Sequence, residues 1–267
     1  MRPITVVVHG AMGKMGKTVV NAVCLDPETK LVGAVDIKVS GDRLQIPDGS
    51  GEVPLSSDLD SILTGQKPDV MIDFSVAKAA MPAIRSAAAR KINVVIGTTG
   101  FTASDLEEIN KLVETNGIGA VMASNFALGA VVMIHLARVA GQYFDYAEII
   151  ELHHNMKMDA PSGTAISTAR SMAQAKGKQF SRPPVEKGEP LESRGQQTEG
   201  ISIHSVRLPG LLAHQEVIFG AAGQTLTIRH DTIDRDCFMP GVLLATKAVV
   251  KRRGLTIGLA PILGLEG

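Results

Sequence analysis

Short apolar runs rich in β-branched residues alternate with longer segments of helical periodicity over the first half of the chain. The runs that we expect to form strands are residues 4–8, 31–35, 70–72, 93–96 and 120–122. The segments that suit helices are residues 14–25, 57–63, 79–90 and 103–116. Continuous apolar strands separated by helices are typical of a parallel sheet covered on both faces.

Two of the predicted helices carry signals for their ends. Ser104 is a candidate N-cap for the segment 103–116, and Gly117 is its expected stop. Pro82 would break the interior of a helix over 79–90, so we expect it in the first turn.

The pattern changes after Asn125. The predicted elements, in order, are a helix at 127–139, a strand at 147–152, a helix at 162–175, a long loop at 177–200, strands at 201–208, 216–219 and 225–230, a helix at 236–252 and a short returning strand at 254–263. Three strands without intervening helices indicate a mostly antiparallel second sheet. The long loop is of a length that usually has a function.

Composition narrows the class of protein. Lys plus Arg and Asp plus Glu both number 27, so the formal net charge is zero, and only 3% of residues are aromatic. Such a chain is poorly suited to bind nucleic acid or an anionic membrane. Cys24 and Cys237 stand far apart in no metal-ligand spacing, which argues against a disulfide framework or a structural zinc site. We find no signal-peptide pattern and no long apolar span, so we expect a soluble cytoplasmic protein.

A glycine-rich segment follows the first predicted strand. Its residues are Gly10, Ala11, Met12, Gly13, Lys14, Met15 and Gly16. A strand-to-helix turn there would direct backbone N–H groups and a helix dipole at a phosphate. Asp36 lies 20 positions past Gly16, where a carboxylate can accept hydrogen bonds from a ribose. This combination favours a dinucleotide site over a bare glycine turn.

A phosphate-loop NTPase is a less favoured alternative. Gly16-Lys17-Thr18 resembles the end of its motif, and the run 70–73 resembles a strand that ends in a magnesium-binding Asp. The first glycine of the motif would fall on Ala11, however, and Asp36 would have no role.

The segment 151–165 concentrates groups that suit a reductase of a carboxylated substrate. His153, His154 and Lys157 supply proton donors and positive charge. Ser162 is a plausible N-cap that would direct the N–H groups of Gly163 and Thr164 outward as a carboxylate cradle. The same side chains would also suit a solvated loop. The pattern argues against a metal site and a serine nucleophile, because adjacent histidines rarely converge and no Gly-x-Ser-x-Gly elbow surrounds the serine.

Two further loops follow predicted parallel strands. They contain Gly97, Thr98 and Thr99 after the fourth strand, and Ala123, Ser124, Asn125 and Phe126 after the fifth. The carboxyl ends of such strands are where open α/β sheets bind ligands, although either loop could be an ordinary turn.

Together these motifs resemble the 4-hydroxy-tetrahydrodipicolinate reductase family, also called dihydrodipicolinate reductase, of the bacterial diaminopimelate and lysine pathway. The resemblance rests on residues 10–16, 95–101, 123–126 and above all 151–165, and it spans nearly the whole chain. It implies a Rossmann-type parallel sheet domain plus a smaller α+β substrate domain with an open, mostly antiparallel sheet. We expect the NAD(P)-binding domain at 1–125, the substrate-binding and oligomerisation domain at 126–233, and a return to the first domain at 234–267.

The resemblance also implies roles for single residues. His153 would be the proton donor or acceptor and Lys157 a second donor, with His154, Gly163 and Thr164 holding a cyclic dicarboxylate. The segment 10–16, Asp36, residues 97–99 and residues 123–126 would hold NADH or NADPH. Asp36 favours a free 2′-hydroxyl, whereas Lys14 and Lys38 could meet a 2′-phosphate, so cofactor preference stays open. The family further implies a homotetramer.

Two other classes of function stay open. One is a different two-domain NAD(P) oxidoreductase acting on a dicarboxylate, which a substrate screen would reveal. The other is a non-catalytic dinucleotide sensor, which would bind NADH without turning anything over.

Overall fold

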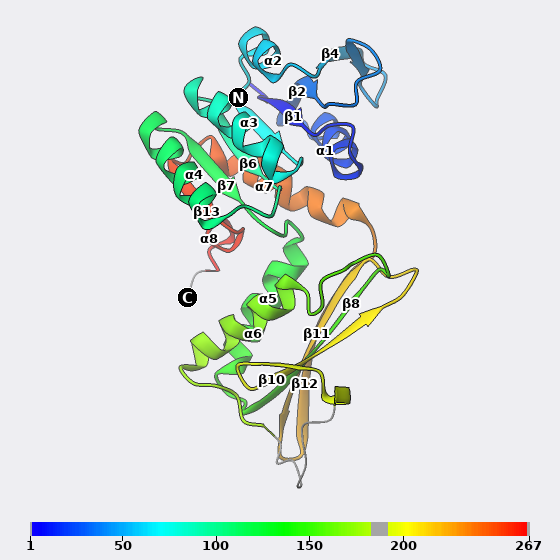
Figure 1. The fold of residues 1–267 in the computed structure, drawn as a ribbon, viewed down its shortest axis with the longest axis vertical. Coiled ribbons are helices and arrows are strands. Elements are labelled where there is room, and N and C mark those ends of the chain that lie inside the picture. The colour runs from blue at the N-terminus through cyan, green and yellow to red at the C-terminus, as the bar shows by residue number, and fades with distance from the viewer. Residues whose placement is uncertain (1, 183–191, 266–267) are drawn as a thin grey trace. The chain divides into compact units, whose positions relative to one another are not determined.

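The computed structural model describes residues 2–182 and 192–265 (Figure 1). The chain forms two compact units. The first comprises Met1–Leu128 and Arg235–Gly267, and the second comprises Gly129–Asp234.

The first unit is built on one eight-stranded sheet with the order β13-β7-β6-β5-β1-β2-β4-β3. Its strands are β1 Ile4–His9, β2 Thr29–Val35, β3 Arg43–Gln45, β4 Glu52–Ser56, β5 Val70–Asp73, β6 Asn93–Ile96, β7 Gly119–Met122 and β13 Gly254–Ile257. Every pairing is parallel except that of β3 with β4. The predicted α/β class and parallel sheet are confirmed, and the order around β1 is the Rossmann order with its switch point beside β1.

Helices cover both faces of this sheet because its strands are apolar on both sides. Their bounds are α1 Lys14–Leu25, α2 Leu59–Gln66, α3 Ala77–Ala89, α4 Ala103–Asn116, α7 Met239–Val249 and α8 Ala260–Leu263. The helix α1 packs against α7, while α3 packs against both α2 and α4. Val6, Val7 and Val8 are all fully buried, so successive side chains of β1 enter the two opposite cores.

The structure corrects several predictions for this unit. Thr102, not Ser104, caps α4: its hydroxyl accepts the Asp105 N–H at 3.1 Å, and the Asp105 carboxylate accepts the Thr102 N–H at 2.8 Å. Such a reciprocal capping box satisfies two free backbone donors. Gly117 is the left-handed C-cap, as predicted. Pro82 lies inside α3 rather than in its first turn, because the helix begins already at Ala77.

Two strand regions also differ from the predictions. The hairpin β3/β4 was not predicted. Of the segment 254–263, only Gly254–Ile257 is a strand, and Ala260–Leu263 forms a short helix. Before α7, the expected helical segment begins with a 3-10 turn at Arg235–Phe238.

The second unit packs two helices, α5 Leu128–Gly141 and α6 Gly163–Lys176, on a five-stranded sheet of order β12-β11-β8-β10-β9. The strands are β8 Tyr146–His153, β9 Gln196–Thr198, β10 Ile201–Arg207, β11 Ala213–Ala221 and β12 Gln224–Thr232. Only the pairing of β10 with β8 is parallel, which confirms the mostly antiparallel sheet.

The core of this unit lies between the sheet and the helices. Side chains of β8, β10 and β11 such as Ile149, Ile203 and Val217 pack there against α6 residues such as Ala169 and Met172. The expected loop 177–200 contains the strand β9 and a 3-10 turn at Glu192–Arg194, and its residues 183–191 lie outside the described part. The loop prediction was therefore wrong for Gln196–Thr198, where pairing with β10 organises polar residues.

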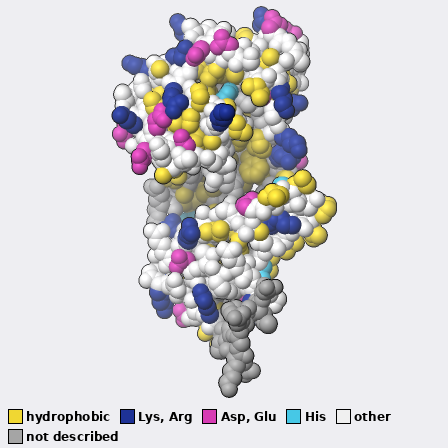
Figure 2. Space-filling view, in the orientation of Figure 1, with side chains coloured by type: hydrophobic (Ala, Val, Ile, Leu, Met, Phe, Trp, Pro, Cys, Tyr) yellow, Lys and Arg dark blue, Asp and Glu magenta, His cyan; other side chains and the backbone are white. Residues whose placement is uncertain are grey.

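On the face shown in Figure 2, Lys and Arg side chains are interspersed with Asp and Glu side chains, in line with their equal numbers in the sequence. Among the described residues, none of the helices has both the length and the apolar character needed to cross a bilayer.

Candidate active site

The loops of the first unit that we predicted to bind a ligand lie along one edge of its sheet. His9 pairs with Val35 and with Asp73, Asp73 pairs with Ile96, and Ile96 pairs with Met122. The strands β1, β2, β5, β6 and β7 therefore end in register. Each predicted cofactor-binding segment follows one of these ends, so the structure brings them together where parallel sheets bind nucleotides.

The glycine segment is packed so closely that side chains at Gly10 and Gly16 would have no room. A Cβ at Gly16 would lie 1.9 Å from the Gly10 carbonyl oxygen, and a Cβ at Gly10 would lie 2.5 Å from the Phe74 oxygen. Gly10 also has a φ of +80°, which favours glycine. Gly13 is exposed and is the N-cap of α1, without a capping side chain. The first-turn N–H groups of α1 lack intrahelical partners, as an anion site requires.

Asp36 is half-buried directly after β2, and its carboxylate supports the glycine segment. One oxygen accepts the Met12 N–H at 2.9 Å, and the other accepts the Lys38 N–H at 2.9 Å. A carboxylate can accept about four hydrogen bonds, so capacity for ribose hydroxyls remains. Asp36 is thus both a clamp on the loop and a candidate ribose ligand.

The two other predicted cofactor-binding loops, 97–99 and 123–126, contain both exposed and buried residues. Thr99 and Ser124 are exposed, whereas Thr98 and Phe126 are buried. The Phe126 ring packs on Phe74 with centroids 5.7 Å apart, and a Cβ at Gly97 would collide with the same Phe74 ring at 2.2 Å. Among the side chains of these two loops, those of Thr99 and Ser124 are thus the most accessible to a cofactor.

A buried carboxylate, which the sequence suggested only as the magnesium ligand of the NTPase alternative, ties these loops together. Asp73 is fully buried; it contacts His9 Nδ1 at 2.6 Å and accepts hydrogen bonds from Ser75 Oγ at 2.7 Å and Thr98 Oγ1 at 2.5 Å. Thr98 Oγ1 in turn accepts the Ser75 N–H at 2.9 Å. Because its oxygens are enclosed by protein donors, Asp73 is unsuited to hold the magnesium ion of an NTPase. The sequence feature that marks Asp73 is its position as the polar residue that ends the apolar run 70–72.

The second unit carries the histidine and lysine segment at the end of β8. On the face of β8 that meets the helices, Ala147 and Ile149 are apolar, and the next inward positions are Glu151 and His153. This strand therefore passes from hydrophobic core to polar site along a single face. The ring of His153 is 15% exposed, and Glu151 is fully buried.

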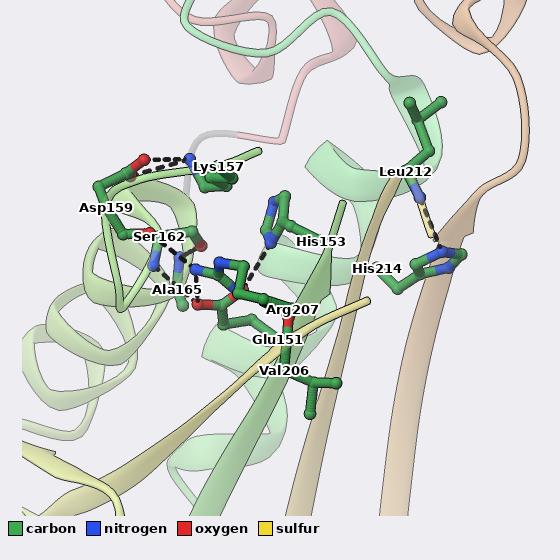
Figure 3. A network of polar contacts seen from close by, with 10 residues as sticks. All are labelled: Glu151, His153, Lys157, Asp159, Ser162, Ala165, Val206, Arg207, Leu212 and His214. Carbon is green, nitrogen blue, oxygen red and sulfur yellow. Dashed lines mark hydrogen bonds and ion pairs between the residues drawn. The ribbon is translucent and has the colours of Figure 1, made fainter. Parts of the chain in front are cut away.

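Glu151 organises the site (Figure 3). Its Oε2 lies 2.5 Å from His153 Nδ1 and 2.8 Å from Arg207 Nη1, and its Oε1 lies 2.7 Å from Arg207 Nη2. Burial raises the pKa of this carboxyl, but hydrogen bonds from His153, Arg207 and Ser205 outweigh it and lower the pKa to about 2. Glu151 is therefore ionised at neutral pH. Sequence reasoning did not single out Glu151 as a functional group, and it missed Arg207, which lies far along the chain.

Lys157 lies in the loop between β8 and α6. Its Nζ donates to both oxygens of Asp159 at 2.7 and 2.8 Å, and its N–H donates to the His154 carbonyl at 3.1 Å. The Lys157 side chain is 22% exposed, and that of Asp159 is 60% exposed. The ion pair pulls the Asp159 pKa below its usual range. The cation therefore stands at the surface, next to a carboxylate that an anionic ligand would have to displace.

The N-terminus of α6 adjoins this cluster. Ser162 is its N-cap, as predicted, with its hydroxyl accepting the Ala165 N–H at 3.1 Å. The Ser162 N–H donates to Glu151 Oε1 at 3.1 Å. Gly163 is exposed, and a Cβ there would meet nothing within 4 Å. The first-turn N–H groups of Gly163 and Thr164 have no intrahelical partner, so they can bind a carboxylate.

Within residues 2–182 and 192–265, no group of three or more His, Cys, Asp or Glu side chains is placed to hold a metal ion. The polar cluster of the second unit contains one fork-shaped ion pair, one histidine, one lysine and a helix N-terminus. These groups can bind a dianion and exchange a proton with it.

Sequence models of known families match both parts of the chain. Residues 4–126 match the dihydrodipicolinate reductase N-terminal model, and residues 129–263 match the C-terminal model. A 4-hydroxy-tetrahydrodipicolinate reductase of Dehalococcoides mccartyi is 57% identical over 99% of this chain and 100% of its own length. That of Thermosynechococcus vestitus is 47% identical over 98% of this chain and 97% of its own.

A solved structure agrees with these matches. The dipicolinate-bound dihydrodipicolinate reductase from Paenisporosarcina sp. TG-14 superposes with a TM-score of 0.86 at 40% identity, over 97% of this chain and 99% of that one. An amine dehydrogenase from Mycobacterium smegmatis, at 15% identity and a TM-score of 0.63, shares the fold alone. The two family models together match nearly the whole chain, and full-length relatives exceed half identity, so this chain belongs to the dihydrodipicolinate reductase family.

Proposed function

We propose that the protein catalyses the NAD(P)H-dependent reduction of 4-hydroxy-tetrahydrodipicolinate to tetrahydrodipicolinate, in lysine and diaminopimelate biosynthesis. The observation that carries the proposal is the cluster at the end of β8, where a buried carboxylate holds His153 beside the N-terminus of α6. This cluster lies in a chain that is 57% identical over its length to a reductase of that name.

The reaction sets three requirements on the protein. Water leaves the 4-hydroxy ring, a hydride adds to the carbon that carried the hydroxyl, and a proton completes reduction of the double bond. When bound, the reduced nicotinamide supplies the hydride. The chain must hold the cofactor, bind two carboxylates, and supply the proton at the ring.

The dinucleotide would be held at the edge of the first sheet. Gly10, Ala11, Met12, Gly13, Lys14, Met15 and Gly16 form the cradle in which a Cβ at Gly16 has no room. Asp36 would receive the ribose, and the loops 97–99 and 123–126 would line the nicotinamide side. The proposal includes both NADH and NADPH as the cofactor. The Asp36 carboxylate disfavours the 2′-phosphate of NADPH, whereas the exposed Lys14 and Lys38 favour it.

The dicarboxylate would be held by the second unit. Gly163 and Thr164 would donate N–H groups to one carboxylate, and His154 would lie beside the ring. Lys157 Nζ donates to both oxygens of Asp159. On substrate binding it would give up at least one of these hydrogen bonds and donate to a substrate oxygen instead. His153 would deliver or accept the proton. The relative from Paenisporosarcina, which is described as dipicolinate-bound, gives a precedent for a small cyclic dicarboxylate.

We further infer that the protein works in the cytoplasm as a homotetramer. The sequence contains only two cysteines, Cys24 and Cys237, and so sparse a use of cysteine suits a reducing compartment. Size-exclusion chromatography with light scattering measures the assembly directly.

The test is a coupled spectrophotometric assay in which a synthase supplies the unstable substrate in situ and oxidation of NADH or NADPH is followed at neutral pH. We expect turnover by the wild type and a fall in kcat of about 100-fold or more in His153→Ala and Lys157→Ala, with NADH affinity nearly unchanged. Lys178→Ala, at a residue 68% exposed, is the matched control and should retain full activity.

Each outcome decides one part of the proposal. A wild type that oxidises neither cofactor refutes the reductase, and binding of NADH without any turnover favours a dinucleotide sensor. Full turnover in either variant refutes the role of that residue while leaving the reaction itself intact.

A further inference from the structure

Two residues that touch neither substrate nor cofactor in the proposed mechanism contact the ring of His153 or the carboxylate that holds it. Glu151 precedes it by two positions on β8, and Arg207 is its register partner on the neighbouring strand β10. Because side chains two apart on a strand share a face, and partners in register share it too, all three side chains lie on one side of the sheet. The sheet therefore places them together without any loop.

Hydrogen-bond donors surround the Glu151 carboxylate. His153 Nδ1 and Arg207 Nη1 reach Oε2 at 2.5 and 2.8 Å, and Arg207 Nη2 and the Ser162 N–H reach Oε1 at 2.7 and 3.1 Å. An ionised carboxylate accepts hydrogen bonds and donates none. The hydrogen bond to His153 consequently requires a proton on Nδ1 in every charge state of that ring.

We propose that Glu151 and Arg207 are positioning residues, which hold His153 in the tautomer protonated on Nδ1 so that Nε2 exchanges the proton with the substrate. The inference rests on the proposed role of His153 as proton donor. Without the carboxylate, a neutral imidazole could carry its proton on either nitrogen, and a ring with Nε2 protonated could not accept a proton there.

Arg207 stabilises the buried Glu151 carboxylate. An unpaired ionised carboxyl in a fully buried position is strongly unfavourable, and the two parallel bonds of the guanidinium offset this cost. Arg207 Nη2 also donates to the Asp159 carbonyl at 2.7 Å, in the loop that carries Lys157. One ion pair thus fixes the ring of His153, the loop of Lys157 and, through Ser162, the start of α6.

Glu151→Gln tests the role of the charge with little change in shape. The Gln carbonyl oxygen can still accept from the Ser162 N–H and Arg207 Nη2, but the NH₂ group in place of Oε2 would face His153 Nδ1 and Arg207 Nη1. Because an NH₂ group can only donate, it favours the His153 tautomer protonated on Nε2. We expect kcat to fall by about 100-fold or more, as when a histidine loses the acceptor that sets its tautomer. The KM for the substrate and the Kd for NADH should change by less than about 3-fold, because the α6 cradle and the first unit are retained.

The tautomer itself has a spectroscopic signature. Two-bond ¹H–¹⁵N correlation spectra of protein labelled with ¹⁵N-histidine distinguish Nδ1–H from Nε2–H, and the His153 signal is assigned by its loss in His153→Ala. We expect Nδ1–H in the wild type and a shift toward Nε2–H in Glu151→Gln. A purely structural role of Glu151 would lower stability without moving this signal.

A second histidine offers a matched control. His214 Nδ1 lies 2.6 Å from Asp231 on the neighbouring strand, so Asp231→Asn makes the same chemical change at another histidine–carboxylate pair. This variant should keep kcat within about 2-fold of the wild type, whereas a comparable loss there would show that any such neutralisation damages the enzyme and would overturn the proposal.

The outcomes separate the inference from the function on which it rests. If His153→Ala is inactive while Glu151→Gln turns over at the wild-type rate, the positioning role is wrong and the proton donor stands. If His153→Ala is fully active, the role of His153 fails and the positioning role fails with it. If Glu151→Gln does not fold, the wild-type spectrum still decides, because an Nε2–H tautomer of His153 would overturn the proposal.

Discussion

Gly16 offers the sharpest test of the cofactor cradle. In Gly16→Ala the added Cβ would lie 1.9 Å from the Gly10 carbonyl oxygen, 2.7 Å from its carbon and 2.8 Å from Ala11 Cα. All three are backbone atoms, so no side chain can turn away, and the loop and α1 must separate by more than 1 Å to reach an ordinary contact.

This separation has two costs, one in folding stability and one in the affinity for NADH. Overpacking of a dense site typically costs about 1–3 kcal/mol of folding stability. Displacing backbone N–H groups from a phosphate loses charge-assisted hydrogen bonds of about 1.5–3 kcal/mol each. Loss of one such bond raises the Kd for NADH about 10- to 100-fold, at about 1.4 kcal/mol for each factor of ten.

The assay is titration of NADH followed by nicotinamide fluorescence, together with urea unfolding of the same samples. Gly65→Ala is the control: Gly65 lies inside α2 and a Cβ there meets nothing within 4 Å, so the same substitution should stabilise the protein by about 0.5–1 kcal/mol. A Gly16→Ala protein that binds NADH with the wild-type Kd and unfolds at the wild-type urea concentration would refute the close packing of the loop.

Two predictions concern the stability of the second unit. Because the Glu151 pKa is lowered to about 2, its stabilising contribution is complete above about pH 5 and is lost as the pH falls toward 2. Urea unfolding should show the wild type losing about 3 kcal/mol more than Glu151→Gln over this range, and parallel profiles would contradict the depressed pKa. Lys176, 5% exposed, donates to the Phe144 carbonyl at 2.8 Å and lies 3.1 Å from Asp145, so Lys176→Met should cost about 1–3 kcal/mol of unfolding free energy. Lys178→Met, at a side chain 68% exposed beside the same Asp145, should change it by less than about 0.5 kcal/mol, and equal losses in the two variants would argue against a buried role for Lys176.

The sequence predicted most of what depends on local pattern. The apolar runs at 4–8, 31–35 and 93–96 are strands, and the helix over 14–25 has the bounds of α1, because burial on both sides and a glycine before the helix leave little choice. The hairpin β3/β4 was missed, since Arg43–Gln45 and Glu52–Ser56 have only three and five residues and become strands by pairing with each other and, for β4, with β2. Thr102 was missed as the cap of α4, although Asp105 three positions later completes a capping box.

In the candidate site too, the sequence predicted what depends on local pattern and missed what depends on the pairing of distant strands. Reactive side chains such as His153, at the end of β8, and Lys157, in the loop after it, were recognised because several such types stand close together in sequence. Their partners follow from strand register, which no local pattern contains: Arg207 faces His153 across a parallel pairing formed by residues more than fifty positions apart.

The two buried carboxylates, Asp73 in the first unit and Glu151 in the second, illustrate what such partners do. Each is fully buried at or near the end of an apolar strand, and each contacts the Nδ1 atom of a histidine, His9 or His153, and is hydrogen-bonded to a neighbouring loop. A charge in that position is costly unless several donors meet it, so it persists only where the surrounding strands are fixed in register. The same donors are thereby fixed in place: Thr98 at the edge of the first sheet, and His153 with the start of α6 in the second unit. A buried acid at a strand end is consequently a better guide to the rigid part of such a site than the exposed residues that sequence patterns emphasise, because its hydrogen-bond partners cannot reorient without leaving it unsatisfied.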